Sequence, residues 1–160
     1  MKFSFTDKDR GWAALVKLRG QRGAAKAGIV GTKASEIREG EELTNAELGL
    51  VHEFGSADGR TPMRSFLRES FDVNREKYVE HAKRLAIAIY EGKIFIRDAL
   101  EVLGMEAASD MQALIRTSIP PPDAPATVRR KGSSTTLIDS AQLIGSISSA
   151  VDMGSKAGAE

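Results

Sequence analysis

Two long runs of apolar residues at helical spacing, separated at Gly92, limit the fold of this chain more than any other feature. The first run extends from about Met63 to Tyr90 and would span roughly 40 Å as one helix. Its apolar positions are Leu67, Phe71, Tyr78, Ala82, Leu85 and Ile89. The second stripe consists of Ile96, Leu100, Leu103, Ala107, Met111 and Leu114. The pattern predicts two antiparallel helices that bury these stripes against each other or against a sheet.

Shorter elements are predicted before the first long helix. Trp12, Leu15, Val16 and Leu18 recur at helical spacing and indicate an amphipathic helix between residues 7 and 19. Alternation around Ile29 indicates a strand over 24–32. The acidic stretch 33–43 suits an exposed loop or a hairpin tip. Thr44 with Glu47 forms a capping box for a short helix, which Gly55 ends.

Patterns in the C-terminal residues indicate one further helix and one further strand. Asp139 or Ser140 would cap a short helix through Leu143 and Ile144, and 146–151 would form a closing strand. We therefore expect one α+β domain over 1–160, with a small antiparallel sheet packed against two long helices plus short helices. Residues 154–160 are expected to fray.

A long Pro-rich segment, 118–136, holds four of the five prolines and should interrupt helical structure. Because it offers few apolar anchors, we expect a flexible loop in the monomer that becomes fixed on assembly. Arg129, Arg130 and Lys131 make it a candidate assembly loop. Three charges without interleaved aromatic residues are only a weak pattern for phosphate binding.

The composition excludes several classes of protein. The chain has 23 basic and 22 acidic residues and no cysteine, so neither a general attraction to nucleic acid nor disulfide, thiolate-zinc or iron–sulfur chemistry is expected. The first residues lack the apolar region of a signal peptide, and the run 85–90 is too short to cross a bilayer. We expect synthesis in the cytoplasm and no membrane partner.

The stretch 48–71 is the most patterned local region. His52 beside Glu53 suggests metal or acid–base chemistry, but Ser56 stands where an HExxH zinc site needs its second histidine. A carboxylate that is partly buried favours a guanidinium partner, so we expect Glu53 to hold Arg64 or Arg68, or to pair with a neighbouring subunit.

No catalytic framework is visible elsewhere. The glycines do not form a phosphate-binding loop, and the Ser/Thr cluster at 133–136 has no His/Asp framework to activate a nucleophile. We therefore expect no enzyme activity and no cofactor. Three phenylalanines, Phe54, Phe66 and Phe71, are expected to pack the short helix onto the long one.

The motif His52-Glu53-Phe54-Gly55, followed by Pro62-Met63-Arg64-Ser65-Phe66-Leu67-Arg68, resembles the signature of tailed-phage virion morphogenesis proteins. These are neck and tail-completion proteins of the head–tail joint. A second block, 126–132 followed by Leu137-Ile138-Asp139-Ser140-Ala141-Gln142-Leu143-Ile144-Gly145-Ser146-Ile147, is similar to that family's Thr/Lys loop and Leu-Ile-Asp-Thr-Gly-x-Leu-x-x-Ser-Ile motif. Ser65, Ser140 and Ala141 depart from the family pattern, which has Pro, Thr and Gly there.

The resemblance implies a structural subunit of the virion neck, made in the host bacterial cytoplasm. Such subunits form homo-oligomeric rings that complete or terminate the tail, or join it to the head. Implied partners are copies of itself, the tail tube protein and head connector proteins (portal, adaptor or stopper), with non-specific contact to DNA in the channel. The alternative is a small nucleic-acid-associated or regulatory helical protein, which would retain DNA in a salt-dependent way.

Overall fold

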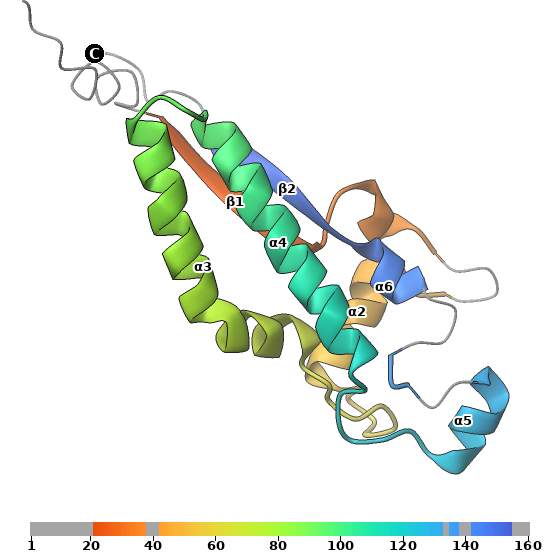
Figure 1. Ribbon diagram of the computed structural model, residues 1–160. Helices are drawn as coiled ribbons and strands as arrows, with labels where there is room; N and C mark the ends of the chain where they lie inside the picture. Colours follow the sequence, from red (N-terminus) through yellow and green to blue (C-terminus); the bar gives the residue numbers. More distant parts are fainter. Residues whose placement is uncertain (1–20, 38–41, 133–134, 138–141, 155–160) are drawn as a thin grey trace, which may run out of the picture.

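The computed structural model describes residues 21–37, 42–132, 135–137 and 142–154, and has an α+β fold (Figure 1). In chain order the elements are β1 (Arg22–Ile29), η1 (Thr32–Ser35), α2 (Asn45–Phe54), α3 (Phe66–Tyr90), α4 (Ile96–Arg116), α5 (Pro125–Lys131), α6 (Gln142–Ser146) and β2 (Ile147–Gly154). The helix predicted at 7–19 lies outside the described residues.

The sheet pairs β1 with β2 in an antiparallel register that runs from Arg22 opposite Gly154 to Ile29 opposite Ile147. Both predicted strands are confirmed, although β1 begins and ends earlier than the predicted 24–32. Gly154 belongs to β2, so the prediction of a frayed end is wrong for this residue. Residues 155–160 lie outside the described part of the chain.

The two long helices are confirmed as an antiparallel pair, and α4 packs on both strands of the sheet and on α3 (Figure 1). At Gly104 the helix approaches the sheet so closely that a Cβ atom would stand 3.0 Å from the Cβ of Ser149. Gly92, with φ of 71°, forms the turn between α3 and α4. None of the helices in the described ranges combines the length and apolar content needed to cross a membrane.

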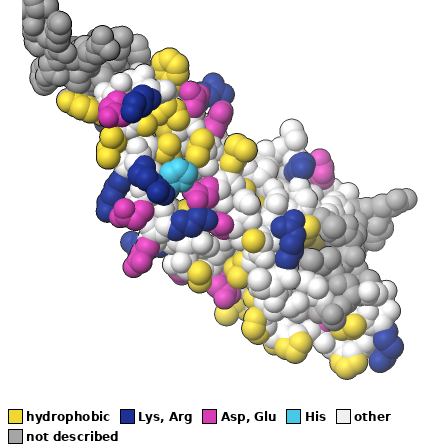
Figure 2. Space-filling model, in the orientation of Figure 1, with side chains coloured by type: hydrophobic (Ala, Val, Ile, Leu, Met, Phe, Trp, Pro, Cys, Tyr) yellow, Lys and Arg dark blue, Asp and Glu magenta, His cyan; other side chains and the backbone are white. Residues whose placement is uncertain are grey.

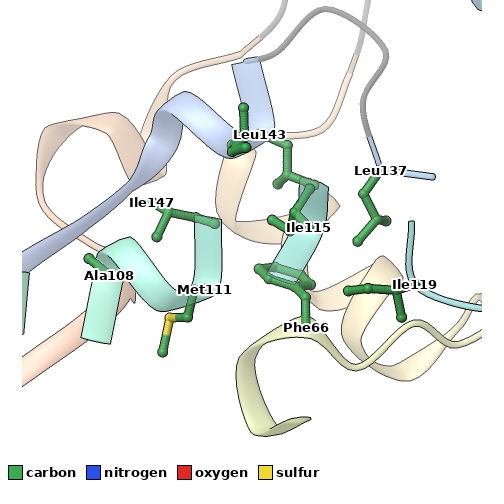
Figure 3. Packing of buried hydrophobic residues seen from close by; sticks show 9 residues of the cluster. Phe66, Ala108, Met111, Ile115, Ile119, Leu137, Leu143 and Ile147 are labelled. Carbon is green, nitrogen blue, oxygen red and sulfur yellow. The ribbon is translucent and has the colours of Figure 1, made fainter. Parts of the chain in front are cut away.

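The core lies at the end of the molecule where α2, α3, α4 and α6 meet (Figure 1), and its packing is seen from close by in Figure 3. Its buried members are Phe66, Ala108, Met111, Ile115, Ile119, Leu137, Leu143, Ile144 and Ile147. Phe66 and Ile115 are completely buried at its centre. The core therefore joins residues from both halves of the chain.

The long helix α3 is much less buried than its apolar stripe predicts. Of its 25 residues only Phe66 and Ser70, both in the first turns, are buried. Phe71 is exposed, and Tyr78 and Leu85 are only half-buried. The reason is that α3 packs mainly on α4, leaving the side that faces the sheet uncovered.

The Pro-rich segment is more structured than predicted. Pro125 begins α5, where its missing N–H group costs no intrahelical hydrogen bond, and Gly132 ends it with φ of 67°. Ile119 is buried in the core, and its carbonyl oxygen accepts a hydrogen bond from the buried hydroxyl of Thr136 (2.9 Å). The prediction that this segment lacks apolar anchors is therefore wrong, while its mobility stays a prediction.

Candidate functional site

The motif residues 52–68 form a joint between α2 and α3. The capping box predicted for α2 is confirmed: Thr44 accepts from the Glu47 backbone N–H, and the Glu47 carboxylate accepts from that of Thr44. Gly55 ends this helix with φ of 80° and ψ of 162°, a conformation that only glycine adopts readily. A turn then brings the chain back, with the Ser56 N–H donating to the Thr61 carbonyl (2.9 Å).

Glu53 is the centre of this joint, with a residue exposure of 2%. Its carboxylate accepts hydrogen bonds from the Ser65 hydroxyl (2.6 Å), the Leu67 backbone N–H (2.9 Å) and the Arg68 Nε–H (2.9 Å). The first N–H groups of a helix have no intrahelical partner. Glu53 therefore caps α3 from the last turn of α2.

The hydrogen bonds around this carboxylate favour its ionised form. Burial alone would raise the pKa of Glu53, but hydrogen bonds from Ser65, the Leu67 backbone and Arg68 together lower it below the ordinary value. The Arg68 guanidinium also lies over the Phe54 ring, 4.9 Å from its centroid. The predicted ion pair of Glu53 with Arg68 is confirmed.

Arg64 has a different partner from the one predicted. Its backbone N–H donates to the His52 carbonyl (2.7 Å), while its guanidinium donates to the Pro121 carbonyl and the Asp123 carboxylate (2.9 Å to the latter). Arg64 and Asp123 are both buried or nearly so. The pairing of Arg64 with Glu53 is wrong, because this side chain anchors the Pro-rich segment instead.

The predicted phenylalanine cluster is also wrong. Phe66 lies at the centre of the core, but Phe54 is 60% exposed and Phe71 packs against Tyr78, with 5.7 Å between ring centroids. Pro62 is exposed in the loop, and Leu67 packs at the margin of the core.

Within the described ranges, no three His, Cys, Asp or Glu side chains are grouped as a metal site would require.

The second motif block contributes to the core. Leu137, Leu143, Ser146 and Ile147 are buried, and the Ser146 hydroxyl donates to the Leu143 carbonyl (2.7 Å). Ile138 and Asp139 lie outside the described residues, as does the side chain of Lys131. Arg129 and Arg130 are exposed on α5.

Sequence reasoning missed a polar cluster between α3 and α4. Lys77 contacts Asp110 (2.7 Å) and Glu106 (3.3 Å), the Tyr78 hydroxyl donates to Asp110 (2.9 Å), and His81 contacts Glu106 (2.5 Å). The hydrogen bond to Asp110 raises the pKa of Lys77, and the bond to His81 lowers that of Glu106. The charged residues of opposite sign on the two predicted helices are the sequence feature that could have indicated this cluster.

Comparison of this chain with models of protein families, with curated proteins and with solved structures found no match.

Proposed function

We propose that this protein is a structural subunit of the neck of a tailed-phage virion, a ring-forming tail-completion, tail-terminator or head–tail joining protein. The observation that supports it best is the meeting of the two motif blocks in one core (Figure 3). Phe66 comes from the first block, and Leu137, Leu143 and Ile147 come from the second. The resemblance thus rests on residues that together build one structural unit.

The polar motif residues have structural roles as well. Glu53 caps α3, and Arg64 fixes the Pro-rich segment to the same joint. These contacts hold three segments in a set orientation, which a subunit with closely defined neighbours requires. Because these polar groups of the motif bind one another within the subunit, contacts with a neighbour would have to come from the outer surface.

The outer surface offers apolar side chains for contact with a neighbour. Ile87, Tyr90 and Phe95 are exposed around the turn between α3 and α4, and Phe95 is 79% exposed. Figure 2 shows hydrophobic side chains at this end of the molecule. Exposed apolar groups of this kind favour burial in a protein interface. In the described residues the outer edge of β2 is a second surface for pairing with another chain.

Native mass spectrometry of the purified protein tests the proposal. We expect a closed ring for the wild type and loss of the ring for Phe95→Asp. The control is Val73→Asp, which places the same charge on a similarly exposed position near the opposite end of α3 and should leave the ring intact. A monomer at all concentrations that is retained by DNA in a salt-dependent way would contradict the proposal and favour the nucleic-acid-associated alternative.

A further inference from the structure

An apolar groove of about 660 Å³ lies between β1, α3 and α4. It exists because α3 packs on α4 and not on the sheet. Its lining includes Ala27 from β1, Val79 and Ala82 from α3, and Leu103 from α4. Val79 is 47% exposed there. Such a surface gains free energy when another apolar surface covers it.

A second hollow of about 430 Å³ adjoins the groove and shares Arg75 and Val79 with it. Its lining adds Glu76 and Glu80. The groove is thus apolar along most of its length, with the cations Lys26 and Arg75 in its lining and the carboxylates of Glu76 and Glu80 beside it. A partner that matches this surface needs an apolar stripe flanked by charged groups of both signs.

The sequence immediately before β1 has these properties. Residues 7–19, outside the described ranges, carry Trp12, Leu15 and Val16 at helical spacing, and residues 1–20 hold five basic and two acidic side chains. As a helix, 7–19 would be roughly 20 Å long, and the α3 positions that line the groove, from Phe71 to Ala82, extend about 17 Å. A helix over 7–19 would therefore be about as long as the groove.

The connection also favours an occupant from the same chain. Only Gly20 and Gln21 separate the predicted helix from the start of β1, and Ala25 already lines the groove. A short connection gives the segment a high effective concentration next to its binding surface when the geometry permits.

We propose that residues 7–19 form a helix that docks into the groove between β1, α3 and α4 of its own subunit. Trp12, Leu15 and Val16 then cover the apolar lining, and the charged residues of the segment lie at the margin of the groove. This contact does not depend on ring formation, so it can be tested whether or not the protein assembles.

Trp12 is the sole tryptophan of the chain, so its fluorescence reports directly on the segment. We expect blue-shifted emission and weak quenching by acrylamide in the full-length protein, both unchanged on dilution. Val79→Glu, which puts a charge into the groove, should red-shift the emission and increase quenching severalfold. The matched control Val73→Glu, on an α3 position that is 74% exposed and does not line the groove, should change neither.

Far-UV circular dichroism of both variants shows whether the rest of the fold is retained. Solvent-exposed emission from the wild type would overturn the proposal, and so would equal responses of the two variants. Loss of Trp12 protection on dilution would also overturn it, because the groove would then hold the segment of another copy.

Discussion

At the scale of single residues, Glu53 joins two helices that are separate in sequence. Its carboxylate accepts hydrogen bonds from three groups at the start of α3: the Ser65 hydroxyl, the Leu67 backbone N–H and the Arg68 guanidinium. Ser65 itself makes no side-chain cap for α3. The orientation of α3 therefore depends on a side chain from α2.

Glu53→Gln should lower the free energy of unfolding at neutral pH by about 2–4 kcal/mol, because an amide brings donors to a site built from donors. Urea unfolding measures this. Glu69→Gln, at the exposed acidic position in the first turn of α3, is the matched control and should cost less than about 0.5 kcal/mol. Equal effects of the two substitutions would contradict the capping role.

The stabilisation by Glu53 should depend on pH, which a comparison of the wild type with Glu53→Gln measures. The folded-state pKa of Glu53 lies below its ordinary value, so its stabilisation is complete above the ordinary carboxyl pKa and is lost as pH falls through the lowered folded value. The difference in unfolding free energy between wild type and Glu53→Gln should therefore shrink in acid. A difference that stays constant from neutral to strongly acidic pH would show that Glu53 is not held as the ionised acceptor.

Gly55 should be hard to replace for two reasons. Its backbone has φ of 80° and ψ of 162°, and an added Cβ would stand 3.2 Å from both the Thr61 oxygen and the Met63 nitrogen. Gly55→Ala should cost about 2–3 kcal/mol in thermal or chemical unfolding. Gly59→Ala, with φ of 72° but no atom within 4 Å of its Cβ, should cost only about 1 kcal/mol. The reverse order would argue against a rigid joint.

At the scale of elements, the joint divides the three phenylalanines between core and surface. Phe66 is completely buried, Phe54 lies under Arg68, and Phe71 borders the groove. Phe66→Ala should reduce stability by about 3–5 kcal/mol, whereas Phe54→Ala should cost less than about 1 kcal/mol. Denaturant unfolding compares them. Similar losses would mean that Phe54 also belongs to the core.

The Pro-rich segment should be held by Arg64. Arg64→Lys removes the forked contact with Pro121 and Asp123, so amide hydrogen exchange in 119–131 should accelerate about tenfold. Arg60→Lys is the control, because Arg60 is exposed and contacts only the nearby Asp58 among the ion pairs of the described residues. Unchanged exchange in Arg64→Lys would show that other contacts fix the segment.

The sequence predicts features that depend on interactions between neighbouring residues, but it does not predict those that depend on contacts between distant residues. The ends of α2 were predictable because Thr44, Glu47 and Gly55 act within their own helix. Periodicity predicts a start of α3 near Met63, but the helix begins at Phe66 because its cap comes from Glu53. Similarly, the partner of Arg64 is Asp123, which no local pattern connects to it. Periodicity identified the stripe of α3 without showing how much of it α4 would cover.

At the scale of the whole molecule, the core, the joint and the Pro-rich segment form one end, and α3, α4 and the sheet extend from it (Figure 1). This arrangement places the exposed turn at Phe95 at the other end of α3 and α4, and the apolar groove extends along α3 from Phe71 towards it. The two proposals therefore assign different surfaces to different contacts. Residues 7–19 would cover the groove, and neighbouring subunits would contact the turn.

Electron microscopy of the purified protein mixed with tail tubes, assembled from the tube protein of the same genome, tests the proposed neck function most directly. The account predicts a ring of this protein docked on the end of the tube, and no such ring with Phe95→Asp. Bare tube ends in the presence of well-folded wild-type protein would contradict it.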